Sequence, residues 1–216
     1  MSAPTRVAVL ASGNGTNLAA LLDAARDPGF PAEVVLVLSN RRDCRALDIA
    51  HEREVETLSL PVSGFGGDGM ARDRAMVDAL RAAKTDLIVL AGYNRVLSDD
   101  VLAAFPGAIL NVHPSLLPAF GGGMSAVEDA LAAGVKVTGC TVHLLAAGAV
   151  DAGPIILQAA VSVKDDDDVE SLHQRIHVEE WRLLPEAVQL WAAGRLLVDG
   201  GKVRIAPQWH VRERVS

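Results

Sequence analysis

Residues 6–22 read RVAVLASGNGTNLAALL, and this stretch decides the fold. Its first part, residues 6–11, is apolar and partly β-branched, which predicts a buried strand. A glycine-containing loop follows at 12–17, and residues 18–22 have the composition of a helix. The order of strand, glycine loop and helix predicts the first unit of an α/β sheet.

The same alternation continues along the chain. Residues 86–91 form a nearly continuous apolar run, which is typical of a parallel strand covered on both faces. Strands alternating with helices predict a doubly wound, mostly parallel sheet with helices on both faces and a Rossmann-like N-terminal half. We expect a kink or break at Pro185 in the last long helix. Further strands are expected at 33–38, 55–60, 108–112, 135–145, 154–163 and in a hairpin over 196–205, helices at 44–52, 70–83, 98–105, 125–133 and 169–193, and a loop at 63–69.

Composition limits the classes of protein to which this chain can belong. The chain has 216 residues, 50% of them hydrophobic, and a net charge of −7. Without a basic stripe we expect no nucleic acid partner, and without an apolar run of about 20 residues we expect no membrane span. The cysteines, Cys44 and Cys140, have no metal-like spacing, and the N-terminus does not resemble a signal peptide. We therefore expect a cytoplasmic protein without a metal.

A second informative stretch is Asn111-Val112-His113-Pro114-Ser115-Leu116-Leu117-Pro118, which follows an apolar segment. Asn111 and His113 are two residues apart, so their side chains point the same way in an extended chain. Pro114 prevents an interior strand from continuing. An amide and an imidazole are therefore expected at the carboxyl end of a strand, where open α/β sheets place their ligands.

Five motifs together resemble those of the glycinamide ribonucleotide formyltransferases, the folate-dependent, single-domain type. The resemblance covers almost the whole chain and implies one formyltransferase domain over 1–216. Its halves would be a phosphate-binding α/β half at 1–105 and a folate-binding, catalytic half at 106–216. The motifs are Ser12-Gly13-Asn14-Gly15-Thr16-Asn17, Ala91-Gly92-Tyr93-Asn94-Arg95-Val96-Leu97, residues 111–118, Gly139-Cys140-Thr141-Val142-His143 and Asp151-Ala152-Gly153-Pro154-Ile155-Ile156-Leu157-Gln158.

The resemblance implies transfer of a formyl group from 10-formyltetrahydrofolate, the co-substrate, to the amine of glycinamide ribonucleotide in purine biosynthesis. It also implies that Asn111, His113 and Asp151 are catalytic. Amine attack on a formyl carbon builds negative charge on oxygen, which an amide and an imidazolium can stabilise. A carboxylate at Asp151 would favour the charged imidazole and orient it. The alternative roles are a buried structural histidine for His113 and a turn residue for Asp151.

The resemblance also implies the binding residues. The loop before the first helix can bind a phosphate through free backbone N–H groups, although it could also be a plain turn. Glu180 and Arg74 could instead lie on solvated helix faces, and we expect His143 to be structural. The implied substrate-binding residues are Gly15, Thr16, Asn17 and Glu180, and the implied cofactor-binding residues are Arg74, Asn94, Arg95, Val96, Leu97, Asn111, Ala147, Gly148, Ala149 and Val150.

Three features depart from the family pattern. Residues 121–123 are all glycine, in a loop one residue longer than usual, and the segment 144–150 is also one residue longer. Because glycine raises the entropic cost of ordering a loop, we expect a looser folate site that orders on binding. Asn94 replaces a common methionine, which makes that wall more polar.

Other functions remain open. Formyltetrahydrofolate hydrolases share the motif behind an added N-terminal domain, which we do not expect here because the first strand begins near residue 5. Formyltransferases acting on initiator methionyl-tRNA add a basic RNA-binding domain, whereas this chain is acidic. A folate- or nucleotide-binding module without activity is the non-enzyme alternative. We expect small-molecule substrates as the partners, and a monomer or weak homodimer.

Overall fold

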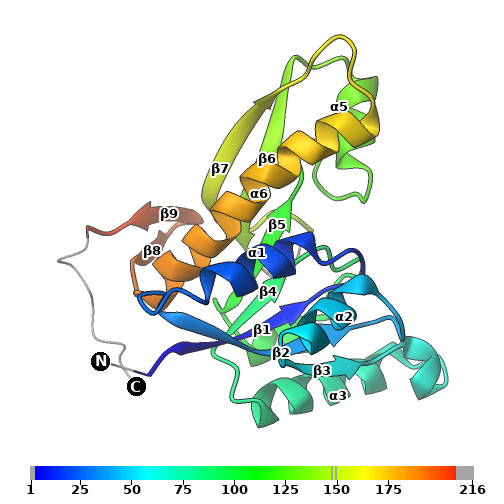
Figure 1. Cartoon of the computed structure of the whole chain (residues 1–216), viewed down its shortest axis with the longest axis vertical. Coiled ribbons are helices and arrows are strands. Elements are labelled where there is room, and N and C mark those ends of the chain that lie inside the picture. The colour runs from blue at the N-terminus through cyan, green and yellow to red at the C-terminus, as the bar shows by residue number, and fades with distance from the viewer. Residues whose placement is uncertain (1–2, 147, 149, 208–216) are drawn as a thin grey trace. The chain divides into compact units, whose positions relative to one another are not determined.

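The computed structural model describes residues 3–146, 148 and 150–207 (Figure 1). The chain divides into two compact units, Met1–Leu110 and Asn111–Ser216. Strand β5 (Ile109–His113) begins in the first unit and ends in the second. The prediction of a single domain whose halves meet at residues 105 and 106 stays a prediction.

The first unit holds four parallel strands in the order β3-β2-β1-β4. They are β1 (Thr5–Leu10), β2 (Ala32–Ser39), β3 (Glu56–Ser59) and β4 (Leu87–Leu90). Every residue of β4 is buried, as its continuous apolar run predicts. Because the strands are parallel, the loops that follow them lie at one edge of the sheet.

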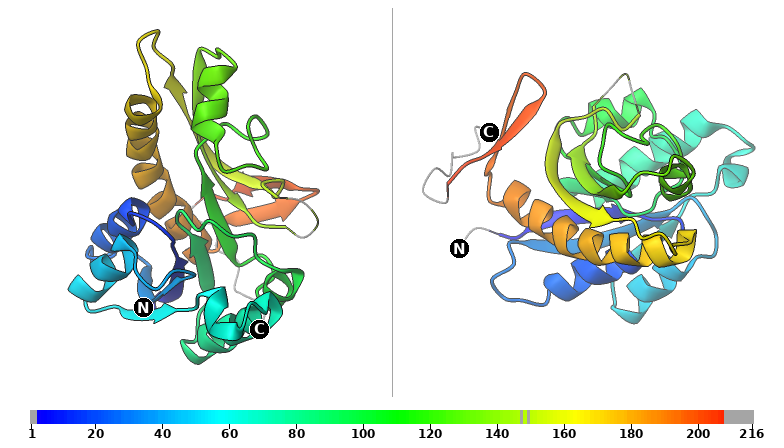
Figure 2. Two further views of the ribbon diagram at one scale, coloured as in Figure 1. Left: turned by 90° about the vertical axis from the view of Figure 1, so that its right-hand side faces the viewer. Right: turned by 90° about the horizontal axis from the view of Figure 1, so that it is seen from above.

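Helices cover both faces of these strands, which confirms the doubly wound class. Figures 1 and 2 show α1 (Thr16–Ala24) and α2 (Arg45–Glu52) on one face and α3 (Gly69–Ala82) on the other. Helix α4 (Asp99–Ala104) packs against α3. The loop expected at 63–69 is partly wrong, because Val62–Phe65 forms a short 3₁₀ turn, η1, that packs against α3.

In the second unit, β6 (Val137–Leu144) lies between β5 and β7 (Ile155–Ser162). Strands β6 and β7 are antiparallel, so the sheet is mostly rather than wholly parallel. All residues of β6 after Val137 are buried. The pairing register shifts between Val142 and His143, where Ile156 of β7 is the extra residue. Such a bulge turns the neighbouring side chains.

Helix α6 (Val169–Ala192) packs along β6 and β7 and also against α5 (Ala126–Ala132), as Figure 1 shows. Asp168 and Ser171 form a reciprocal capping box at its start. The break considered at Pro185 is wrong, because the helix is continuous through that proline. The hairpin expected near the C-terminus is present as β8 (Leu196–Asp199) and β9 (Lys202–Ile205). Among the described residues, no helix is long and apolar enough to cross a membrane.

Candidate functional site

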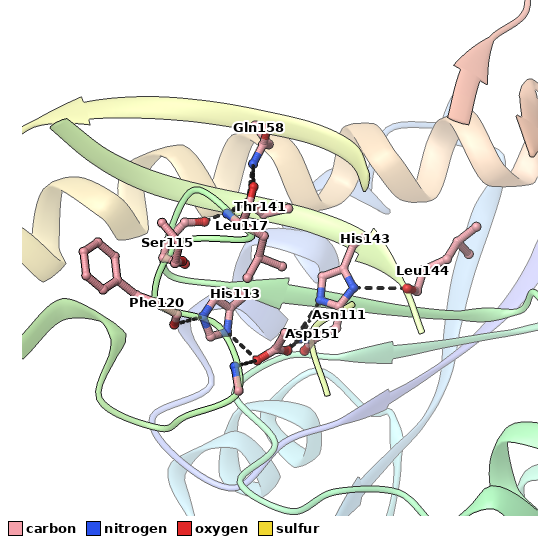
Figure 3. A network of polar contacts seen from close by, with 12 residues as sticks. Asn111, His113, Ser115, Leu117, Phe120, Thr141, His143, Leu144, Asp151 and Gln158 are labelled. Carbon is pink, nitrogen blue, oxygen red and sulfur yellow. Dashed lines mark hydrogen bonds and ion pairs between the residues drawn. The ribbon is translucent and has the colours of Figure 1, made fainter. Parts of the chain in front are cut away.

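The carboxylate of Asp151 is the centre of a polar cluster in the second unit (Figure 3). One oxygen, Oδ2, accepts from the backbone N–H of Gly122 at 2.9 Å and lies 3.5 Å from His113 Nδ1. The other, Oδ1, accepts from Asn111 Nδ2 at 3.4 Å and lies 3.7 Å from His143 Nε2. The side chain of Asp151 is only 8% exposed, so its charge is stabilised by these groups rather than by bulk water.

Asn111 and His113 lie at the end of β5, and both side chains reach Asp151, as the two-residue spacing predicts. His113 is buried, and its Nε2 lies 3.0 Å from the carbonyl oxygen of Phe120. Each ring nitrogen therefore faces an oxygen acceptor. An N–H on either nitrogen therefore has a hydrogen-bond partner within the protein.

His143 completes the cluster, although the sequence suggested only a structural role for it. Its Nδ1 lies 3.1 Å from the carbonyl oxygen of Leu144, so Nδ1 carries the hydrogen of the neutral ring. Nε2 is then an acceptor, and Asn111 Nδ2 donates to it at 3.1 Å. Burial lowers the pKa of His143, while the Leu144 carbonyl and Asp151 oppose that shift. His143 therefore holds the amide of Asn111 as a neutral acceptor.

The sequence could not identify this contact, because His143 lies within an apolar strand and 32 residues from Asn111. The register shift after Val142 places His143 at the irregular end of the β6–β7 pair. A single sequence contains no clear signal for that bulge. The only available hint is a histidine in a segment that otherwise consists of small and apolar residues.

A second network holds the segment after β5 in place (Figure 3). Thr141 Oγ1 donates to the Ser115 carbonyl at 2.7 Å and accepts from the backbone N–H of Leu117 at 3.0 Å. Gln158 Nε2 donates to Thr141 Oγ1 at 2.9 Å and to the Leu117 carbonyl at 3.0 Å. Side chains from β6 and β7 thus fix the chain directly after His113.

Two residues of the cluster have left-handed backbone conformations. Phe120 and Asp151 both have φ of +56°. Asp tolerates this region better than most residues, whereas an aromatic residue there is strained. Strain of this kind is concentrated at functional sites. The carbonyl of Phe120 is the one that faces His113 Nε2, so the strained residue is in direct contact with the imidazole.

In the first unit, the glycine loop leads into α1 as predicted. Gly15 is the residue before the helix, with φ of +72°, and a Cβ there would lie 2.7 Å from Ala46 Cα. Close packing against α2 therefore also requires a glycine at this position. Gly13 is exposed, and a Cβ there would meet nothing within 4 Å. Thr16 is half-buried and Asn17 is buried, both in the first turn of α1.

The folate segment implied by the sequence lies in the loop between β4 and α4. Asn94, Arg95 and Val96 are exposed, and Leu97 is buried. Arg74 is exposed on α3, on a solvated helix face. Its neighbour Arg72 is instead buried, where it pairs with Asp73 and donates from Nη1 to the Tyr93 hydroxyl at 3.1 Å.

The remaining sequence-predicted residues lie in the second unit. Glu180 is only 3% exposed, which excludes the surface position considered for it, and His177 Nδ1 lies 2.8 Å from its Oε2. Gly148 and Val150 are exposed in the loop before Asp151. Ala147 and Ala149 lie outside the described residues. In the part of the chain that the structure describes, no group of three or more His, Cys, Asp or Glu side chains could hold a metal ion.

Comparison with known proteins shows the family. Residues 5–188 match the model of the formyl transferase family. The chain is 48% identical to a phosphoribosylglycinamide formyltransferase of Mycobacterium tuberculosis, over 94% of this chain and 95% of that protein. It is 44% identical to the trifunctional purine biosynthetic protein adenosine-3 of Bos taurus, over 92% of this chain but only 19% of that longer protein.

The fold agrees with these matches. A crystal structure of glycinamide ribonucleotide transformylase 1 from Symbiobacterium toebii superposes with a TM-score of 0.91 at 48% identity. The superposition covers 94% of this chain and 95% of the other. The α/β class, with a mostly parallel sheet and helices on both faces, is therefore confirmed.

Proposed function

The chain belongs to the formyl transferase family, and from that premise we propose that it transfers the formyl group of 10-formyltetrahydrofolate to the amine of glycinamide ribonucleotide. The observation that carries the proposal is the cluster in which one buried carboxylate, Asp151, contacts both Asn111 and His113. The relatives that match this chain over nearly their whole length are named for the same reaction. The name of the longer Bos taurus protein supports a place in purine biosynthesis.

The amine of the ribonucleotide attacks the formyl carbon, and the carbonyl electron pair moves to oxygen. An oxyanion and a cationic nitrogen result. Asn111 and His113 supply N–H groups to the oxyanion, and stabilisation of this type is commonly the largest single contribution to catalysis of acyl transfer. Collapse of the intermediate breaks the bond from the formyl carbon to the folate nitrogen, and that nitrogen receives the proton released by the amine.

The N–H groups of the catalytic residues all have partners before substrate arrives. Both amide hydrogens of Asn111 Nδ2 are used, by His143 at 3.1 Å and by Asp151 at 3.4 Å. The longer contact is the weaker one, so the oxyanion takes the hydrogen now directed at Asp151. On His113, the group that must be freed is Nε2, now opposite the Phe120 carbonyl.

Asp151 has a positioning and electrostatic role in this mechanism. Its carboxylate lies 3.5 Å from His113 Nδ1, so it stabilises positive charge on the imidazole when the ring is protonated. The same carboxylate holds the loop at Gly122 through a backbone hydrogen bond. Loop position and imidazole charge are therefore controlled by one side chain.

We assign the substrates to the segments suggested by the sequence. The ribonucleotide phosphate binds the N-terminus of α1 at Gly15, Thr16 and Asn17, where backbone N–H groups and the helix dipole favour an anion. The buried carboxylate of Glu180 serves the same substrate. The folate segments are 94–97, with Arg74, and 147–150, and no step requires a metal. We further propose a cytoplasmic enzyme that is a monomer or weak homodimer.

The deciding experiment is a spectrophotometric assay with 10-formyl-5,8-dideazafolate, with and without glycinamide ribonucleotide. Turnover that requires the ribonucleotide supports the transferase. Release of the deformylated folate without it would replace the transferase with a formyltetrahydrofolate hydrolase. A lack of turnover in both cases, together with binding of either ligand, would favour the non-catalytic binding module.

A further inference from the structure

Three loops of the first unit are joined by a closed ring of hydrogen bonds, two between side chains and one from a backbone N–H to a side chain. Ser12 Oγ donates to Asn40 Oδ1 at 2.5 Å, and Asn40 Nδ2 donates to Asn94 Oδ1 at 3.0 Å. The backbone N–H of Asn94 donates back to Ser12 Oγ at 3.1 Å. Each of the three residues donates once and accepts once. Hydrogen bonds in a closed series polarise one another, so breaking one weakens the others.

The ring lies where three neighbouring parallel strands end. Ser12 follows β1, Asn40 follows β2 directly, and Asn94 follows β4. These strands are adjacent in the order β2-β1-β4. One backbone contact accompanies the ring, because the Ser12 N–H donates to the Gly92 carbonyl at 3.1 Å. The loops after β1 and β4 therefore move together or break these bonds.

The two loops joined in this way belong to different substrates in the proposed function. Ser12 is the first residue of the glycine loop 12–17, whose last three residues are assigned to the ribonucleotide phosphate, and Asn94 is the first residue of the segment 94–97 assigned to folate. Asn94 is exposed while Ser12 is only 3% exposed. The ring thus connects an exposed residue of the folate loop to the buried first residue of the glycine loop.

We propose that the ring of Ser12, Asn40 and Asn94 couples the binding of the two substrates, with Asn94 as a positioning residue. The inference rests on the proposed function. Because the ring ties the two loops together, a ligand that holds one loop in place also holds the other, and the second ligand then meets a loop that is already ordered. Such coupling is reciprocal, so each substrate raises the affinity for the other by the same factor.

The test measures this factor in a complex that cannot react. The dissociation constant of 5,8-dideazafolate, which has no formyl group, is measured by titration calorimetry with and without saturating glycinamide ribonucleotide. We expect a factor of about 5 or more in the unmodified chain. Asn94→Met removes one acceptor from the ring and Asn40→Ala removes a donor and an acceptor, and we expect both to bring the factor to about 1.

Two further variants separate coupling from general damage. Asn94→Asp keeps an oxygen acceptor for Asn40 and is expected to retain the factor, even if added charge changes each affinity. Ser59→Ala is the matched control, because Ser59 Oγ donates to the Arg41 carbonyl at 2.7 Å, a hydrogen bond between the end of β3 and the loop after β2 that is not part of the ring. We expect it to leave the factor unchanged. Thermal melts establish that each variant is folded.

The outcomes distinguish this inference from the proposed function. If turnover requires the ribonucleotide but the factor in the unmodified chain is near 1, the coupling is overturned and the proposed function stands. The same holds if Asn94→Met and Asn40→Ala keep the factor of the unmodified chain. Failure of the unmodified chain to bind either ligand overturns the proposed function and the coupling with it. Loss of the factor in both ring-opening variants but not in Ser59→Ala supports the coupling.

Discussion

His113 is the residue with the greatest proposed contribution to the transfer, because both of its ring nitrogens face groups that can exchange a proton or a hydrogen bond. We expect His113→Ala to lower kcat by about 10²–10⁴-fold, because it removes an N–H donor to the oxyanion together with any proton transfer through the imidazole. Initial rates in the dideazafolate assay measure the loss. His51→Ala, an exposed histidine on α2, is the control and keeps full activity. Unchanged turnover in His113→Ala would overturn the mechanism.

Asn111 is expected to act on the oxyanion rather than on substrate affinity. Because its amide contacts develop fully only in the transition state, Asn111→Ala lowers kcat by about 10²–10³-fold while KM changes little. Steady-state rates at varied folate and ribonucleotide concentrations separate the two constants. A variant with a raised KM and a normal kcat would show that Asn111 only binds substrate.

His143 acts through Asn111, so its effect should differ from that of a purely structural histidine. His143→Phe fills the buried site but removes the acceptor for Asn111 Nδ2. We expect kcat to fall by about 10–100-fold, since misplacement of a catalytic group by a small distance has this effect. His143→Gln offers an amide oxygen as acceptor and should recover part of the loss. Equal activities of the two variants, both folded by thermal melting, would assign His143 a packing role.

At the scale of elements, strand β6 contains two buried threonines that differ in their hydrogen bonding. Thr141 Oγ1 joins three partners, whereas Thr138 Oγ1 is buried without a hydrogen-bond partner among the described residues. We expect Thr141→Val to lower the free energy of unfolding by about 1–3 kcal/mol, because it leaves buried polar groups unsatisfied. Thr138→Val should be neutral or stabilising. Urea denaturation of the pair tests this, and equal losses would contradict it.

The elements show which features a sequence can predict. Strands and helices followed from periodicity because burial repeats every two or 3.6 residues, and the placement of Asn111 beside His113 followed from the same rule. Contacts between distant segments of the second unit could not be predicted from periodicity. The bulge next to His143 depends on the pairing between β6 and β7, which no local pattern of residues encodes. The continuity of α6 through Pro185 likewise depends on packing against two strands.

At the scale of the whole chain, polar residues were the hardest to place from sequence. Glu180 and Arg72 are both buried although charged residues usually lie on surfaces, because each has a partner in the fold. Arg74, two residues from Arg72, is exposed. The helical pattern of α3 alone could not decide which arginine is buried, since that depends on the position of Tyr93 after β4.

Two histidines, the buried His143 and the half-buried His173, should make the stability of the whole chain depend on pH. Burial lowers the pKa of His143 below its ordinary 6.5, against the opposing influence of Leu144 and Asp151. Burial and the neighbouring His177 lower that of His173, with Glu180 and Glu128 opposing. The unfolded chain therefore binds protons more readily than the folded chain below about pH 6.5. Full stability is expected above this pH, with a progressive loss as the pH falls.

Urea denaturation midpoints between pH 8 and 5.5 measure this loss of stability. The protonation of His143 changes the free energy of unfolding by at most about 1.4 kcal/mol per pH unit. The pKa values of Asp165 and Asp168 are also lowered, by Lys136 and by Ser171 respectively, but from 3.8, so these carboxylates act only at lower pH. His173→Gln should make the dependence shallower because it removes one of the two histidines. Midpoints that stay constant or rise on acidification would show that these side chains do not control stability in this range.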